Sequence, residues 1–166
     1  KLVVKTSDEF FDNFNSNNEP FDVVFIDGMH QVEYVVKDIN NSIDHLSSNG
    51  KILLDDIIPL NSDEQLKYPI KHSYEDGILK TMVPWTGDVW KVLYHILLFY
   101  RENIEFSHFY NPNYRGVAVL QIKQKFRIPE SGIVSINAYN YTTDFKAYMD
   151  LFTKYTDEHL SSHTLG

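Results

Sequence analysis

Two acidic stretches, each placed directly after an apolar run, are the parts of this chain best suited to do chemistry. The first is Asp27-Gly28-Met29-His30, after the run 21–26, and the second is Asp55-Asp56, after Ile52-Leu53-Leu54. Carboxylate oxygens are ligands that Mg²⁺ or Mn²⁺ prefers, and histidine readily accepts a proton near neutral pH. The pattern therefore predicts a divalent cation held by these aspartates, with His30 beside it as a general base.

The elements around these stretches predict how they are brought together. The run 21–26 is apolar except for Asp22, which is typical of a strand buried on both faces of a parallel sheet. Apolar residues then recur at helical spacing from Val32 to Leu46, and 51–54 is a second buried strand. Strand, helix and strand predict a parallel βαβ unit, and ligands bind beyond the carboxyl ends of such strands. Both acidic stretches therefore fall at the ligand-binding edge.

The pair Asp55-Asp56 sets a geometric condition on this site. Consecutive residues of an extended strand point to opposite faces, so both aspartates can hold one cation only if the backbone turns there. Pro59 ends regular strand pairing and indicates such a turn. The alternative is that Asp27 caps the following helix and that His30 is structural. The joint pattern on neighbouring strands favours the functional interpretation.

Further elements follow from composition and period. The connection 60–85 has no strong period and is either a lid that faces a substrate or a surface excursion with a short helix. Its candidate substrate contacts are Tyr68, His72, Tyr74 and Trp85. Near the N-terminus we expect a strand at 2–5, a helix from Ser7 to about 14 and a left-handed helix cap within 47–50. Farther along, we expect a helix over 89–101 and a hairpin of strands 104–109 and 116–122 around 111–114. The chain should end in an amphipathic helix that carries Phe145, Tyr148, Met149 and Phe152.

Composition excludes several classes of function. The 166 residues fit one domain, and the net charge of −8 argues against a nucleic-acid partner. The absence of cysteine excludes disulfides, thiolate metal sites and a cysteine nucleophile. No apolar run approaches the ~20 residues that cross a bilayer, so we expect a cytoplasmic protein without a membrane partner. The chain opens with Lys1 inside an apolar run, and we expect further sequence upstream of it.

Three segments carry a family resemblance: 21–30 (FDVVFIDGMH), 49–56 (NGKILLDD) and 87–91 (GDVWK). Together they resemble the class I S-adenosylmethionine-dependent methyltransferases, in particular the metal-dependent O-methyltransferases that modify sugars of macrolide antibiotics. The resemblance covers residues 1–123, a partial methyltransferase domain, and leaves 124–166 as a C-terminal extension. It implies an α/β fold with a Rossmann-like sheet that is mostly parallel, has a C-terminal antiparallel strand and lacks the first βαβ portion.

The same resemblance implies roles for individual residues. Mg²⁺ (or Mn²⁺) would bind Asp27, Asp55 and Asp56, and His30 would be the catalytic base. S-adenosylmethionine would lie against four residues, namely Thr6, Ser7, Asp27 and Gly28. The family's Gly-rich turn and its ribose-binding acid would lie upstream of Lys1, and no G-x-G-x-x-G motif occurs in this chain.

We therefore expect an O-methyltransferase, or its C-terminal part, that acts on a hydroxyl of a sugar or other small molecule. Two alternatives stay open. A metal-dependent hydrolase would use the same carboxylates to activate water. A non-catalytic interaction module would explain the missing Gly-rich turn. The terminal helix either packs on the core or forms a contact in a homo-oligomer.

Overall fold

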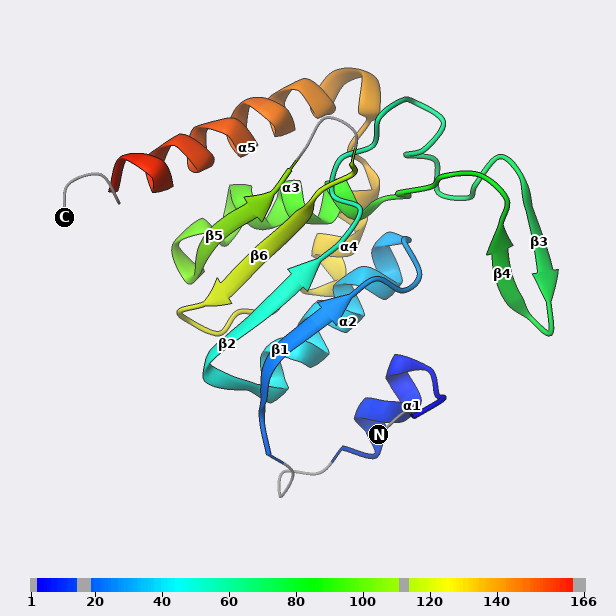
Figure 1. Ribbon diagram of the computed structural model, residues 1–166, viewed down its shortest axis with the longest axis horizontal. Coiled ribbons are helices and arrows are strands. Elements are labelled where there is room, and N and C mark those ends of the chain that lie inside the picture. Colours follow the sequence, from blue (N-terminus) through cyan, green and yellow to red (C-terminus); the bar gives the residue numbers. More distant parts are fainter. Residues whose placement is uncertain (1–2, 15–18, 111–113, 163–166) are drawn as a thin grey trace.

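A four-stranded sheet in the order β1-β2-β6-β5 forms the centre of the described structure (Figure 1). The computed structural model describes residues 3–14, 19–110 and 114–162, with side chains described up to residue 155. The strands are β1 (Phe21–Ile26), β2 (Leu46–Leu54), β5 (Ile104–Phe109) and β6 (Val117–Ile122). β1 is parallel to β2, and β6 is antiparallel to both β2 and β5. Three strands thus run one way and β6 runs the other way, which confirms the expected strand directions.

Helix α2 (Val32–His45) connects the parallel pair and covers one face of the sheet. Its buried side chains recur at helical spacing, as predicted, and comprise Val32, Val35, Val36, Ile39 and Ile43. α2 packs against α3 (Val89–Phe99) and α4 (Glu130–Asn137), and these helices lie behind the sheet in the view of Figure 1. The βαβ unit is confirmed, and it anchors the main hydrophobic core.

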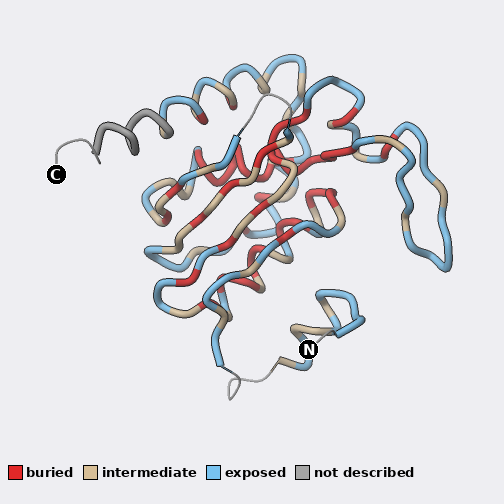
Figure 2. Tube along the Cα trace, in the orientation of Figure 1, coloured by how far each residue is buried: buried red, intermediate tan, exposed pale blue. Residues whose placement is uncertain are grey.

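The prediction that β1 is buried on both faces is wrong for the described residues. β1 pairs only with β2, and Val23 and Phe25 are 56% and 54% exposed. Figure 2 shows the buried stretches concentrated between the sheet and the helices behind it. The apolar run is an edge strand, as expected for a sheet that lacks its first βαβ portion, and its outer side has no partner in the part of the chain that the structure describes.

Two local predictions near β1 also fail. Residues 3–5 are not part of a strand, and residues 1–2 lie outside the described residues. The segment 47–50 is extended within β2, which begins directly after α2, so no left-handed cap forms. A Cβ at Gly50 would lie 2.7 Å from the Leu46 side chain and 3.0 Å from the Phe21 carbonyl oxygen. Gly50 is thus needed for close packing rather than for a helix end.

Helix α1 (Ser7–Asp12) agrees with the prediction, and the sequence contains its start signal. The Thr6 hydroxyl accepts a hydrogen bond from the Glu9 N–H, and the Glu9 carboxylate accepts one from the Thr6 N–H. This reciprocal capping box satisfies two backbone donors of the first turn.

Within the connection 60–85, residues 72–81 form a projecting hairpin, and the expected short helix is absent from this segment (Figure 1). Its strands are β3 (His72–Glu75) and β4 (Ile78–Thr81), paired antiparallel. Asp76 and Gly77 link them with φ values of +51° and +79°. Positive φ at both central residues is typical of a type I′ turn, for which Asp-Gly is a preferred sequence.

The C-terminal helices pack on the same core. A short 3₁₀ turn, η1 (Arg101–Asn103), follows α3, and the β5–β6 hairpin is confirmed, although its tip at 111–113 lies outside the described residues. α5 (Tyr141–Ser162) buries Tyr148 and Phe152, and the Tyr148 hydroxyl donates to the Ile57 carbonyl at 2.9 Å. Within the described residues, no helix is both long and apolar enough to span a membrane.

Candidate active site at the carboxyl ends of β1 and β2

The carboxyl ends of β1 and β2 lie side by side and carry the acidic stretches. Ile26 pairs with Leu54, and the Asp55 N–H donates to the Ile26 carbonyl at 3.1 Å. The chain then turns at Asp56, whose φ is +56°. The Asp55 carboxylate accepts a hydrogen bond from the Asp56 N–H at 2.9 Å, which supports this turn. The backbone turn expected after β2 is present.

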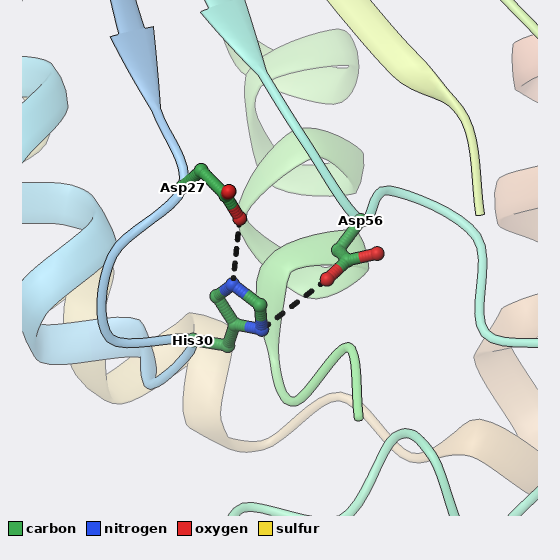
Figure 3. Close-up of side chains that lie close together, drawn as sticks. All are labelled: Asp27, His30 and Asp56. Atoms are coloured by element: carbon green, nitrogen blue, oxygen red, sulfur yellow. Dashed lines mark ion pairs between the residues drawn. The ribbon is translucent and has the colours of Figure 1, made fainter. Parts of the chain in front are cut away.

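The turn brings Asp56 to the cluster and leaves Asp55 outside it. Asp27, His30 and Asp56 each offer one ligand atom, and these atoms lie within 4.8 Å of one another (Figure 3). His30 Nε2 is 3.4 Å from Asp27 Oδ1, and His30 Nδ1 is 3.6 Å from Asp56 Oδ2. Asp55 instead borders a cavity beside β5 and β6, which Asp56 also lines. The structure therefore groups three of the four residues predicted for this site.

Trp85 fixes the His30 ring in two ways. Its main-chain carbonyl lies 3.0 Å from His30 Nδ1, and its indole stacks on the imidazole at 5.1 Å between ring centroids, inclined by 28°. A carbonyl can only accept, so Nδ1 carries the hydrogen and Nε2 of the neutral ring has the free lone pair. Nε2 and Asp27 Oδ1 are then two acceptors 3.4 Å apart, an arrangement that suits a proton between them.

The charge balance of the cluster favours a cation. Burial raises the pKa of Asp56 to about 6; the charges of His30 and Arg115 oppose this shift only in part, and the nearby Asp55 charge adds to it. The positive charges near Asp56 therefore do not offset the effect of burial on its carboxylate. Asp27 and Asp56 would supply the oxygen ligands that Mg²⁺ prefers, which leaves His30 Nε2 available to accept a proton.

A cavity of about 610 Å³ lies on one side of the cluster, between the strand ends and the β3–β4 hairpin. Its polar wall contains Asp27, His30, Asp56 and Arg115, and its other wall is apolar. The apolar residues are Ile78, Leu79, Val83, Pro84 and Trp85. Trp85 thus lines the cavity as expected, whereas Tyr68, His72 and Tyr74 do not contribute to its wall. No motif in the sequence pointed to Arg115.

A second cavity, of about 740 Å³, lies on the other side of Asp27, between α1 and α2. All four residues expected to contact S-adenosylmethionine line it, namely Thr6, Ser7, Asp27 and Gly28. Asp38 also lines it; burial raises the pKa of this carboxyl, and a hydrogen bond from Ser7 partly offsets that effect. Asp27, Gly28 and Met29 border both cavities. The two cavities therefore adjoin at the residues that follow β1.

The comparison with protein families bears on this segment. Residues 1–57 match the family model of a methyltransferase domain. The match ends just beyond Asp56 and includes α1, β1, α2 and β2, so it contains the whole carboxylate and histidine cluster. It supports a class I methyltransferase, and the mixed α/β sheet is compatible with a Rossmann-like methyltransferase fold. The chain has no significant match among curated proteins.

Proposed function

We propose that this chain is an O-methyltransferase, or the C-terminal part of one, that uses S-adenosylmethionine and Mg²⁺ to methylate a hydroxyl group of a sugar or another small molecule. The observation that carries the proposal is the meeting of two cavities at Asp27–Met29, with His30 and Asp56 on one side. A group transfer requires a donor and an acceptor on opposite sides of one point. The methyltransferase-domain match over residues 1–57 supports it independently.

The cavity between α1 and α2 would hold the methyl donor. It combines hydroxyl and carboxylate groups at Thr6, Ser7 and Asp38 with apolar surface from Phe11 and Phe25. Such a mixture suits a ligand with a flat base and several polar groups. S-adenosylmethionine supplies an electrophilic methyl group. This group would meet the acceptor at Asp27–Met29, which border both cavities.

The cavity beside the hairpin would hold the acceptor. Asp27 and Asp56 would hold the cation, and its positive charge would compensate the negative charge of the two carboxylates. Bound Mg²⁺ supplies positive charge that lowers the pKa of a hydroxyl group beside it. The apolar wall formed by the hairpin and Trp85 would exclude water from the reacting oxygen.

His30 would remove the proton of the acceptor hydroxyl. Because Nδ1 donates to the Trp85 carbonyl, Nε2 is the basic atom, and it lies on the Asp27 side of the ring. S-adenosylmethionine would supply the methyl group and would leave as S-adenosylhomocysteine, while His30 Nε2 would hold the proton released by the acceptor hydroxyl. General base catalysis of this kind contributes about 10²–10⁴-fold in rate.

Calorimetric titration with S-adenosylhomocysteine, with Mg²⁺ and with a chelator, tests the proposal. It is paired with transfer of a labelled methyl group to a panel of sugars and polyols. We expect S-adenosylhomocysteine to bind, and transfer to require Mg²⁺ and His30. Asp44→Asn, which alters an exposed ion pair with Arg127 far from the cluster, is the control. The titrations are run on this chain and on a version extended upstream, and S-adenosylhomocysteine binding by the extended version alone would indicate the C-terminal part of an enzyme. Metal binding without S-adenosylhomocysteine binding in both versions would favour the hydrolase, and binding of neither ligand would favour the interaction module.

A further inference from the structure

Glu64 is a buried carboxylate that binds Arg115 through two contacts. Arg115 Nε donates to Glu64 Oε2 at 2.9 Å, and Nη2 donates to Oε1 at 2.8 Å. The same carboxylate accepts hydrogen bonds from the Leu60 N–H and the Asn61 amide. Glu64 is only 7% exposed, so its charge depends on these partners. A planar guanidinium that binds both carboxylate oxygens fixes the geometry of both side chains.

The main chain of Glu64 extends this contact to His30. The Glu64 carbonyl accepts hydrogen bonds from the Thr86 and Gly87 N–H groups, both at 2.9 Å. The next residue, Asp88, donates its N–H to the His30 carbonyl at 2.7 Å. A Cβ at Gly87 would overlap the His30 carbonyl oxygen, so this segment lies directly against the His30 backbone. The residue before Thr86 is Trp85, whose carbonyl accepts the hydrogen bond from His30 Nδ1.

The main chain at Arg115 contacts the residues that follow Asp56, which is another member of the cluster. Its carbonyl accepts a hydrogen bond from the Ile58 N–H at 2.7 Å, and the Gly116 carbonyl accepts one from the Ile57 N–H at 3.4 Å. Ile57 and Ile58 directly follow Asp56, whose positive φ makes its conformation dependent on support from its neighbours. The Arg115 side chain also lines the cavity beside the hairpin.

We propose that Glu64 and Arg115 are positioning residues that hold His30 and Asp56 at the spacing seen in the cluster. Glu64 fixes the segment 85–88 behind His30, and Arg115 fixes the turn after Asp56. The ion pair joins these two supports across the site. Neither side chain is among the three residues grouped as ligands. The effect of this ion pair on methyl transfer rests on the proposed function. Its effect on the geometry of the cluster does not depend on that function.

Glu64→Gln tests the proposal, because it keeps the shape of the side chain and removes its charge. The first readout is Mn²⁺ affinity, measured by the electron paramagnetic resonance of free Mn²⁺. Residues that orient metal ligands affect metal affinity by about 10–100-fold, and we expect a loss in this range. The second readout is the ¹⁵N chemical shifts of the His30 ring, which report which nitrogen carries the hydrogen. We expect the pure Nδ1–H form of the wild type to become a mixture.

Asp44→Asn is the matched control, since it removes the charge of a carboxylate paired with arginine at an exposed position. It should leave both readouts unchanged. If Glu64→Gln does not fold, Arg115→Lys decides the question, because lysine keeps the charge but cannot bind both carboxylate oxygens. Thermal unfolding of every variant shows whether a substitution lowers the melting temperature without changing either readout.

The two readouts separate the possible failures. Wild-type Mn²⁺ affinity and wild-type His30 shifts in a destabilised Glu64→Gln variant would overturn the positioning role and leave a purely structural ion pair. Failure of the wild type itself to bind Mn²⁺ would contradict the metal dependence in the proposed function. The His30 shifts would then still decide between positioning and structure, because they require no metal.

Discussion

The Nδ1 atom of His30 lies 3.0 Å from the main-chain carbonyl oxygen of Trp85, and this contact orients the imidazole. Nδ1 becomes the donor, and Nε2 is directed toward Asp27. A main-chain carbonyl cannot move without moving the whole segment 85–88. The orientation of the proposed base is therefore a property of the fold around it.

His30→Asn should separate catalysis from stability. An asparagine amide can donate to the Trp85 carbonyl in place of Nδ1 but offers no base at the position of Nε2. We expect methyl transfer to fall by about 10²-fold or more, with the free energy of unfolding within about 1 kcal/mol of wild type. His30→Leu should lose about 1–3 kcal/mol, because it leaves that buried carbonyl unpaired. Urea unfolding together with the transfer assay measures both; equal stability of the two variants would contradict this account.

Gly87→Ala should be much more damaging than Gly77→Ala. Both glycines have positive φ, +57° at Gly87 and +79° at Gly77, so alanine costs about 1–2 kcal/mol of backbone strain at either position. Only at Gly87 does an added Cβ overlap another residue, namely His30. We expect a total loss above about 3 kcal/mol for Gly87→Ala, from strain and overlap together. Similar chemical unfolding midpoints for the two variants would show that the segment 86–88 does not press on His30.

Asp56→Asn should stabilise the metal-free protein at neutral and higher pH. The folded pKa of Asp56, about 6, lies above the value of about 3.9 for an unfolded chain. Between these values the unfolded carboxyl is ionised while the folded one keeps its proton, so wild-type stability falls as pH rises from about 4 to about 6 and the loss persists above. Asparagine does not ionise, and we expect a gain of about 1–2 kcal/mol at pH 8 that disappears below pH 4.

Mg²⁺ should reverse this order, because ligand binding stabilises only a protein that can bind it. In excess Mg²⁺ the wild type should become the more stable protein and the variant should not respond. Melting temperatures at pH 4 and pH 8, with and without Mg²⁺, check both parts. A variant that is less stable than wild type at pH 8 without metal would disprove the burial argument.

Asp55→Asn should affect metal binding far less than Asp27→Asn. Asp27 contributes a ligand atom to the cluster, whereas the Asp55 carboxylate accepts a hydrogen bond from the Asp56 N–H, which an asparagine side-chain oxygen can also do. We expect at least tenfold weaker Mn²⁺ binding for Asp27→Asn and a change of only about threefold for Asp55→Asn, from lost charge alone. Equal losses would show that both consecutive aspartates hold the metal.

The sequence could predict the elements that carry strong local patterns. The period of apolar residues in α2 and the runs that became β1, β2, β5 and β6 specify element type by themselves. The same patterns could not predict what covers each element. An apolar run such as β1 indicates a strand, but whether its two sides are covered depends on other segments, and Val23 and Phe25 are half exposed. The Asp76-Gly77 turn of the β3–β4 hairpin was visible in the sequence and was missed.

The candidate site divides in the same way. Asp27, His30 and Asp56 could be predicted to meet because parallel strands end at a common edge, and the structure groups them. The choice between Asp55 and Asp56 depends on the backbone angle of one residue, which no spacing rule specifies. Glu64, Trp85 and Arg115 come from distant segments, and each acts through a main-chain carbonyl as well as through its side chain. No residue pattern marks such contacts.

That dependence on main-chain carbonyls has an evolutionary consequence. The carbonyl of residue 85 would be presented to Nδ1 in the same way by many different side chains, provided that the path of the backbone is kept. Lineages descended from a common ancestor could therefore diverge at position 85 and keep the hydrogen bond that orients the imidazole, although not the stacked indole. Homologues would then be recognised more reliably by superposing their backbones than by comparing their amino-acid identities.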